Sequence, residues 1–263
     1  MPQLEVNGVS LHYIFDGTEG APVLMFANSL GTDLDLWDEQ TPEFAALFRI
    51  LRYDMRGHGK SSEAPGEYRM EDLVGDALGL MDALGVERVH FCGLSLGGMV
   101  GQMLAARHPE RVASLTLCAT ACRIGSPEVW EERIAAVLDR GMTAIVDEVI
   151  ARWFTETFRR QQAEKVEEIK TMLLDTMPLG YAGCCAAVRD ADLCGEITAI
   201  RAPTLCIAGR YDPVTPPERL EELAGRIAGA RMAVLEAAHL VNVEARDAFN
   251  ATLGRFLAEQ EAP

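Results

Sequence analysis

The sequence has few cationic residues. It contains 24 Lys and Arg residues against 40 Asp and Glu residues, which gives a formal net charge of −16 at pH 7. Such a surface repels nucleic acids and anionic membranes, so we expect neither as a partner. It also repels small anions, so an anionic substrate requires a local cationic group in its binding site.

The sequence also lacks the marks of a membrane or exported protein. Its wholly apolar stretches are far shorter than the ~20 residues that cross a bilayer. The first residues, M-P-Q-L-E-V-N-G, have neither the basic region nor the apolar core of a signal peptide. We therefore expect a cytoplasmic protein.

Neither a disulfide framework nor a metal site is predicted. The number of cysteines is odd and no C-x-x-C pair occurs, so we expect buried free thiols in a reducing compartment. The cysteines are Cys92, Cys118, Cys122, Cys184, Cys185, Cys194 and Cys206. No group of His, Cys and carboxylate residues has metal-ligand spacing, so we expect no metal and no cofactor.

The sequence does contain an alternation of strand and helix patterns. Its 263 residues, 49% of them hydrophobic, are enough to bury a large core. The Asn-Gly pair at 7–8 lies between apolar runs and predicts a β-hairpin. Apolar periodicity predicts a helix over 70–84, and short apolar runs predict strands at 23–27, 49–53, 89–92, 115–118, 204–208 and 232–235. This order favours an α/β fold with a mostly parallel sheet covered on both faces.

Only helical patterns occur between about residues 123 and 194. We therefore expect a core formed by 1–122 and 195–263 and an all-helical cap (lid) formed by 123–194. The cap is predicted to lie over the carboxyl edge of the sheet, where open α/β sheets bind ligands. Farther along the chain, Thr215 and Glu218 have the spacing of a capping box before a helix.

The most specific motif is G-L-S-L-G at 93–97, which follows a predicted strand and precedes a predicted helix. This is the setting of a nucleophile elbow, in which a tight turn lifts Ser95 above the sheet. The alternative is a glycine-rich turn with an N-capping serine. The N–H group of Leu96, at the start of the helix, is a predicted donor to negative charge on a substrate oxygen.

A serine nucleophile requires a base and an acid that orients it. Among the histidines, His12 and His90 lie in predicted strands, His108 at a helix end and His58 in a turn, where it is a possible pocket residue. His239 follows the last predicted strand and is the best base. Asp212 follows the strand at 204–208, and the chain order Ser95, Asp212, His239 is the one expected in α/β-hydrolases. Asp54 is a competing acid that precedes the serine.

A second oxyanion donor is expected in the loop after the strand at 23–27. Many α/β-hydrolases carry His-Gly there, whereas this chain has Asn28 and Ser29. Alignment of these pairs makes the backbone N–H of Leu30 the donor, and Ser29 is the donor if the alignment shifts by one residue.

Several longer segments resemble those of the 3-oxoadipate enol-lactonases, which are members of the α/β-hydrolase superfamily. The elbow and the R-G-H-G-K-S loop are shared by many α/β-hydrolases, whereas the segments at 28–37 and 180–190 are more specific to this family. The segments are N-S-L-G-T-D-L-D-L-W (28–37), R-Y-D-M-R-G-H-G-K-S (52–61), G-L-S-L-G-G (93–98), G-Y-A-G-C-C-A-A-V-R-D (180–190) and G-R-Y-D-P-V-T-P-P (209–217).

The resemblance implies an α/β-hydrolase fold and hydrolysis of 3-oxoadipate enol-lactone, a small anionic lactone, to 3-oxoadipate. It also implies a role in the bacterial breakdown of aromatic compounds, in the β-ketoadipate pathway. Ser95, Asp212 and His239 then form the catalytic triad of a serine esterase that acts through an acyl-enzyme.

The carboxylate of this substrate requires a cation in a strongly acidic protein. Within the cap, Arg133, Arg152 and Arg189 are candidates, and we favour Arg133, which lies one helical turn from Trp130. The alternative is that these arginines pair with surface acids. Trp130 and Trp153 are expected to pack the cap or, as the second interpretation, to contact substrate together with Ser29.

Two other functions fit the same motifs. A carboxylesterase or cofactor-free perhydrolase uses the same triad and differs only in the cap. A non-catalytic small-ligand binder on this fold is the alternative from a different class, and the complete triad argues against it.

Overall fold

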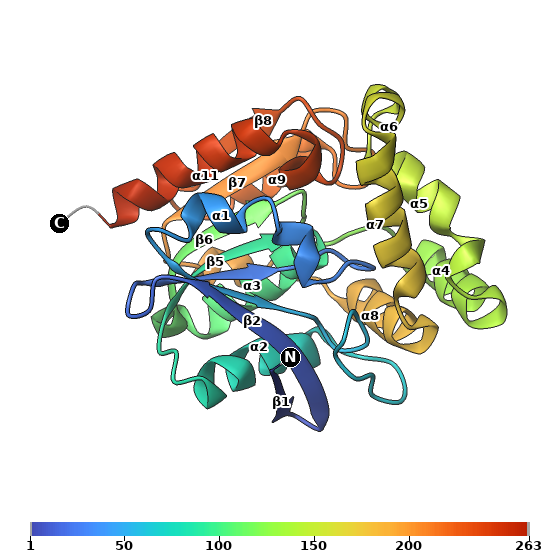
Figure 1. Cartoon of the computed structure of the whole chain (residues 1–263), viewed down its shortest axis with the longest axis horizontal. Helices are drawn as coiled ribbons and strands as arrows, with labels where there is room; N and C mark the ends of the chain where they lie inside the picture. Colours follow the sequence, from blue (N-terminus) through green and yellow to red (C-terminus); the bar gives the residue numbers. More distant parts are fainter. Residues whose placement is uncertain (1, 262–263) are drawn as a thin grey trace.

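The fold is built on one eight-stranded sheet, which a computed structural model describes within residues 2–261 (Figure 1). The strand order is β1-β2-β4-β3-β5-β6-β7-β8. The strands are β1 (Gln3–Val6), β2 (Val9–Gly17), β3 (Val23–Ala27), β4 (Arg49–Tyr53), β5 (Val89–Leu94), β6 (Val112–Cys118), β7 (Thr204–Gly209) and β8 (Arg231–Leu235).

The buried strands of the sheet are parallel, and the first two strands form a hairpin. Strands β5 and β7 are buried along their whole length, as expected for apolar strands covered on both faces. From β4 to β8 the neighbouring strands are parallel, whereas β1 and β2 form the predicted antiparallel hairpin. Asn7 and Gly8 both have positive φ angles, of 49° and 77°, as a tight hairpin turn requires.

Helices cover both faces of this sheet, and Figure 1 shows α2 and α11 on opposite sides of it. The helices are α1 (Thr41–Phe44), α2 (Met70–Ala83), α3 (Leu96–Arg107), α4 (Pro127–Arg140), α5 (Val146–Trp153), α6 (Glu156–Gln161), α7 (Ala163–Asp175), α8 (Pro178–Asp190), α9 (Pro217–Ala224), α10 (Val241–Glu244) and α11 (Arg246–Gln260). Short 3₁₀ turns lie at Leu34–Trp37, Pro109–Arg111, Met142–Ala144 and Glu196–Ala199. The predicted α/β class, with a mostly parallel sheet, is confirmed.

Helices α4 to α8 lie between β6 and β7 in the sequence and gather at one end of the sheet in Figure 1. We call the segment 127–190 the helical insertion. Helix α6 has no buried residue, so its local sequence signal is Thr155, whose hydroxyl accepts the N–H of Phe158 at the start of the helix. The division of the chain into a core and a cap at 123 and 194 stays a prediction.

The expectation of free thiols throughout is wrong for two cysteines. Cys122 and Cys194 form a disulfide with a Cα–Cα distance of 4.9 Å, whereas the other five cysteines are free and buried. The two partners are 72 residues apart in sequence and lie on the segments that join β6 to α4 and α8 to β7. Sequence spacing does not reveal this pairing. Because disulfides persist mainly in oxidising compartments, the cysteines no longer support the predicted cytoplasmic location.

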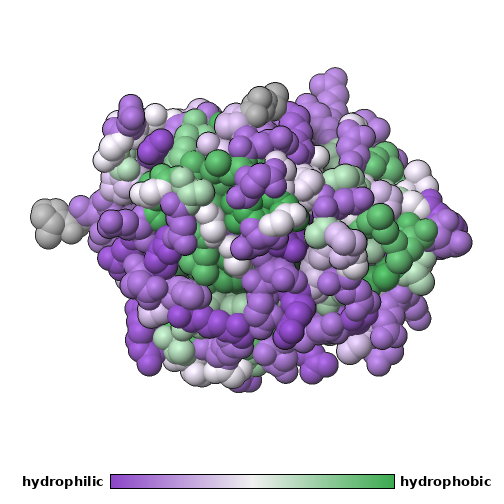
Figure 2. All heavy atoms as spheres, turned by 90° about the horizontal axis from the view of Figure 1, so that it is seen from below, coloured by the Kyte–Doolittle hydropathy of each residue, from purple (hydrophilic) through white to green (hydrophobic). Residues whose placement is uncertain are grey.

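The surface is largely hydrophilic on the face that Figure 2 shows, and apolar side chains show in separate areas. Within residues 2–261, no helix is both long and apolar enough to cross a membrane.

Candidate active site

Ser95 lies in a strained turn between β5 and α3. Its φ and ψ angles are 55° and −111°, a region that non-glycine residues rarely adopt. The neighbouring glycines allow this turn to form: a Cβ on Gly93 would lie 2.2 Å from the carbonyl oxygen of Gly97, and a Cβ on Gly97 would lie 2.3 Å from that of Ala27. The G-x-S-x-G spacing therefore serves to hold Ser95 at the head of a helix beside β3.

His239 and Asp212 form a buried pair at the same edge of the sheet. His239 follows β8, and its Nδ1 lies 2.8 Å from Oδ2 of Asp212 in the loop after β7. An ionised carboxylate at this position favours the tautomer with the proton on Nδ1, which leaves Nε2 free to accept a proton.

Hydrogen bonds from the following loop keep Asp212 ionised. Oδ1 accepts the backbone N–H groups of Val214 and Thr215, and Oδ2 accepts the Thr215 hydroxyl at 2.7 Å. Burial raises the pKa of Asp212, but the charge of His239 and these hydrogen bonds outweigh burial and hold its pKa below the ordinary value.

The predicted capping box at Thr215 is therefore wrong. Helix α9 begins at Pro217 after Pro216, which makes no side-chain capping bond, and the Thr215 hydroxyl serves Asp212 instead. The reason is local competition, since the turn brings a carboxylate within reach of a hydroxyl that would otherwise cap the helix.

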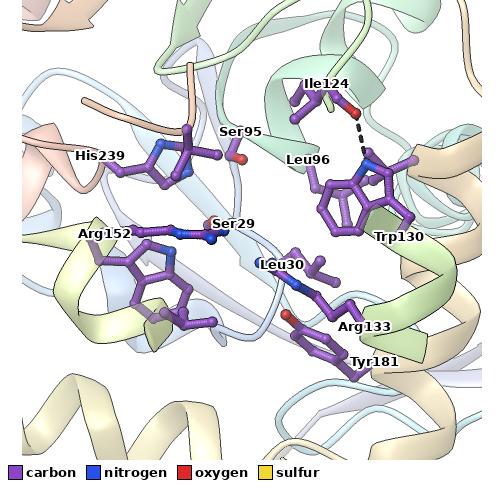
Figure 3. Close-up of a pocket in the computed structure, with 14 residues that line it drawn as sticks. Ser29, Leu30, Ser95, Leu96, Ile124, Trp130, Arg133, Arg152, Tyr181 and His239 are labelled. Carbon is purple, nitrogen blue, oxygen red and sulfur yellow. Dashed lines mark hydrogen bonds between the residues drawn. The ribbon is translucent and has the colours of Figure 1, made fainter. Parts of the chain in front are cut away.

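Ser95 and His239 line one cavity at the carboxyl edge of the sheet, together with Leu30 and Leu96 (Figure 3). Within residues 2–261, no hydrogen bond joins the Ser95 hydroxyl to His239. Such bonds are often long without substrate and shorten in the Michaelis complex. The cavity is also lined by Ser29, Ile124, Trp130, Arg133, Val149, Arg152, Trp153, Tyr181, Val188 and Val214.

Backbone N–H groups near Ser95 are available to a ligand. The neighbouring Gly97 N–H donates to the Asn28 carbonyl, and the Gly31 N–H donates to His58. In the described part of the chain, the N–H groups of Leu30 and Leu96 make no hydrogen bond, and neither does that of Ser29. The arrangement suits the stabilisation of an oxyanion formed by attack of Ser95.

The three candidate arginines have different surroundings. Arg133 lines the cavity, and none of the ion pairs among residues 2–261 includes it; its guanidinium carbon lies 5.1 Å from the centre of the Trp130 ring. Arg152 also lines the cavity but pairs with Glu148. Arg189 is outside the cavity lining and pairs with Glu67 and Asp190. A substrate anion in the cavity therefore meets Arg133 as its unpaired cation.

The two tryptophans and Tyr181 form walls of the cavity. The Trp130 indole donates to the carbonyl of Ile124 at 2.7 Å, which fixes the ring, and the Trp153 carbonyl accepts the N–H of Leu240 beside His239. Tyr181 was missed by the sequence reasoning, although it belongs to the G-Y-A-G segment. Figure 3 shows Tyr181 and Arg133 together, away from Ser95 and His239.

The competing residues have other partners. His58 is not part of the cavity wall and bonds to backbone groups. Asp54 lies 2.7 Å from Nδ1 of His12 and accepts the N–H of Leu34. His90 bonds to Ser114 within the sheet. Among the histidines of the described chain, His239 is the one that lines this cavity.

The chain is similar to known proteins over nearly its whole length. Residues 22–245 match the family model described as alpha/beta hydrolase fold. The chain is 39% identical to 3-oxoadipate enol-lactonase 2 of Acinetobacter baylyi, over 94% of this chain and 92% of that protein. It superposes on the crystal structure of an enol-lactonase from Burkholderia xenovorans with a TM-score of 0.97 and 45% identity, over 98% of this chain and 100% of the other.

A third similar protein is an esterase. The structure of a thermophilic esterase from Thermogutta terrifontis, with malate bound, matches with a TM-score of 0.93 and 30% identity over the full length of both chains.

Proposed function

The chain belongs to the α/β-hydrolase fold family, and on that premise we propose that it hydrolyses 3-oxoadipate enol-lactone to 3-oxoadipate through an acyl-enzyme on Ser95. One observation carries the proposal: a single cavity holds the elbow serine, the histidine of a buried Asp–His pair and an unpaired arginine. The similarity to two enol-lactonases over nearly the whole chain supports the choice of substrate.

The proposed reaction begins at His239. Its Nε2 takes the proton of the Ser95 hydroxyl as the oxygen attacks the lactone carbonyl, and Asp212 stabilises the imidazolium that forms. The N–H groups of Leu30 and Leu96 bind the oxyanion of the tetrahedral intermediate. Collapse of this intermediate breaks the ring C–O bond and expels an enolate, which takes the proton held by His239 and then ketonises, so that His239 is again neutral.

The second half of the reaction uses water. His239 removes a proton from a water molecule that attacks the acyl carbonyl, and the proton then returns to the departing Ser95 oxygen. One lactone and one water thus give one 3-oxo acid. Ketonisation of the enol that ring opening forms favours product.

Arg133 is the proposed partner of the substrate carboxylate. Its guanidinium can form two parallel hydrogen bonds to a carboxylate, and no protein acid within residues 2–261 forms an ion pair with it. Trp130 and Trp153 supply the apolar walls of the same site. We further propose that residues 123–194 act as the cap of this site, and that the reaction belongs to aromatic-compound degradation by the β-ketoadipate pathway in the cytoplasm.

The test compares two substrates. The purified protein is given the enol-lactone and a neutral p-nitrophenyl ester, and kcat/KM is measured for both. We expect the enol-lactone to be turned over faster, because only this substrate can use Arg133. Faster turnover of the neutral ester would favour a carboxylesterase instead, as the similarity to the Thermogutta terrifontis esterase also allows.

A fluorophosphonate probe separates an enzyme from a ligand-binding protein. An activated Ser95 is expected to be labelled, and a Ser95→Ala variant is the control. Absence of labelling in the wild-type protein would point to a binder that has kept the fold. Peroxide-dependent oxidation of a carboxylic acid would point to a perhydrolase.

A further inference from the structure

His58 is a buried histidine that the proposed reaction does not use. Only 1% of its surface is exposed, and it lies outside the cavity wall. Its Nε2 accepts the backbone N–H of Gly31 at 2.9 Å, and its Nδ1 lies 3.1 Å from the carbonyl oxygen of Arg56. The ring therefore bridges two loops, one of which carries Leu30.

Only one form of the imidazole satisfies both contacts. A carbonyl oxygen must receive a proton from Nδ1, and an N–H group must find a lone pair on Nε2. This is the neutral Nδ1–H tautomer. Burial lowers the pKa of His58 and so favours the neutral form, although the Arg56 carbonyl and the charge of Asp54 oppose this shift.

The loop that carries His58 is firmly held. Arg56 donates two hydrogen bonds of 2.6 Å to Asp76 on α2, and both side chains are buried. Gly57 packs closely against Gly180 of α8: a Cβ on Gly57 would lie 2.3 Å from the Cα of Gly180. His58 is thus a fixed support rather than a side chain on a mobile loop.

The turn at 29–32, which His58 contacts through Gly31, contains the predicted oxyanion donor, the N–H of Leu30. The peptide between Ser29 and Leu30 has its carbonyl oxygen bonded to the N–H of Thr32 at 3.2 Å and to the Thr32 hydroxyl at 2.8 Å. In a trans peptide the N–H points away from the carbonyl, so these bonds direct the Leu30 N–H to the other side. The next N–H along the chain, that of Gly31, is held by His58.

We propose that His58 is a positioning residue for the oxyanion: by holding the Gly31 N–H, it fixes the plane of the next peptide and keeps the Leu30 N–H directed into the cavity. The inference rests on the proposed function, because it assigns a role in stabilising the charge formed when Ser95 attacks. A donor that is already oriented needs no reorganisation when charge develops, which is where such sites gain most of their effect.

Two substitutions separate this role from simple space filling. In His58→Gln, the side-chain oxygen can lie near the position of Nε2 and accept from Gly31. In His58→Asn, the shorter amide can reach the Arg56 carbonyl but not Gly31. We expect His58→Asn to lower kcat for the enol-lactone by about 10-fold or more with KM nearly unchanged, and His58→Gln to keep most of kcat.

Inhibitor binding gives a second measurement. A trifluoromethyl ketone analogue adds to Ser95 and forms an oxyanion, whereas a product-like keto acid does not. We expect His58→Asn to weaken the ketone by the same factor as kcat and to leave keto acid binding unchanged. Thr32→Val, which removes one bond to the Ser29 carbonyl, should act in the same direction, and it serves if His58→Asn fails to fold.

The outcomes are distinct. Equal losses in the Gln and Asn variants, no loss in either, or parallel losses for ketone and keto acid would overturn the positioning role. Full turnover by a Ser95→Ala variant would instead remove the proposed function itself, whatever His58 does. Thermal melting of each variant confirms that kinetics are compared between folded proteins.

Discussion

The carboxyl edge of the sheet and the helical insertion contribute different kinds of group to one cavity. The sheet edge contributes Ser95 and His239, with Asp212 hydrogen-bonded to His239; their exposed fractions are 7%, 1% and 3%, and a turn or hydrogen bonds fix each of them. The insertion contributes Arg133 on α4, a helix that leaves Leu138 52% exposed. Under the proposed function, the sheet edge performs the chemistry and the insertion selects the substrate.

The largest effect is expected when the acid at the sheet edge is replaced, because this change should affect the reaction but not substrate binding. Asp212→Asn keeps the shape but removes the charge that holds the Nδ1–H tautomer of His239. We expect kcat to fall by about 10³–10⁴-fold, with little change in the binding of a keto acid. Steady-state kinetics and inhibitor titration measure both quantities.

A second buried Asp–His pair provides the control. Asp54 and His12 are 2.7 Å apart but do not line the cavity. Asp54→Asn is expected to lower thermal stability and to spare kcat in the protein that remains folded. A loss of kcat below about tenfold in Asp212→Asn would contradict the assignment of the triad.

The disulfide at the base of the insertion tests how the two regions are joined. Its partners are separated by 72 residues, so the cross-link restricts a long loop in the unfolded chain. Replacing Cys122 and Cys194 together by serine should lower the free energy of unfolding by about 4 kcal/mol on the loop-entropy model. Urea unfolding measures the loss.

Reductant supplies the matched control for the disulfide. Dithiothreitol should lower the stability of the wild-type protein by a similar amount and leave the double variant unchanged. Equal stability of the wild-type protein and the double variant without reductant would show that the cross-link contributes nothing.

A substitution in the helical insertion tests whether this region selects the anionic substrate. Arg133→Met keeps much of the side-chain volume and removes the cation. We expect kcat/KM for the anionic enol-lactone to fall by about 10–100-fold, the effect of one charge-assisted contact, while a neutral ester is hydrolysed as before. Arg189→Met, outside the cavity, should affect neither substrate. Equal losses on both substrates would mean that Arg133 supports the fold rather than the carboxylate.

The smallest expected effect concerns Asp33, in the loop beside the sheet edge. Burial and the charge of Asp54 raise the pKa of Asp33 from 3.8 to about 7. The folded state therefore binds a proton that the unfolded state releases, and this contribution to stability is complete below pH 4 and is lost as the pH rises towards 7.

Asp33→Asn removes this dependence on pH. Asparagine can still accept the N–H of Asp35 as a helix cap. We expect the variant to be more stable than the wild-type protein at pH 8, by about 1 kcal/mol or more, and not at pH 4. Melting temperatures at the two pH values measure this, and a gain that is the same at both would rule out titration of Asp33.

The sheet edge could be predicted well because its signals are local. Ser95 is marked by two glycines within two residues, and the strands before Asp212 and His239 are short apolar runs. The parallel sheet then brings their carboxyl ends together without further information. The fold class follows from the same alternation.

The features that the sequence did not predict depend on contacts between segments that are distant in sequence. The Cys122–Cys194 disulfide and the bond from Gly31 to His58 join residues far apart in sequence, and no periodic pattern marks them. The Thr215 hydroxyl had two possible partners, the backbone N–H of Glu218 as a helix cap and the carboxylate of Asp212, and the folded loop places it against Asp212. The three candidate arginines all lie on helices, so the sequence does not distinguish them. In the described chain, Arg133 is the one that both lines the cavity and makes no ion pair.

The most direct test of the central claim is the rate at which a folded Ser95→Ala variant opens the enol-lactone at saturating concentration, after subtraction of the spontaneous reaction. If the Ser95 oxygen attacks the lactone carbonyl, the rate should fall by at least about 10⁴-fold while a keto acid still binds. A rate within about tenfold of the wild-type value would contradict nucleophilic catalysis by Ser95.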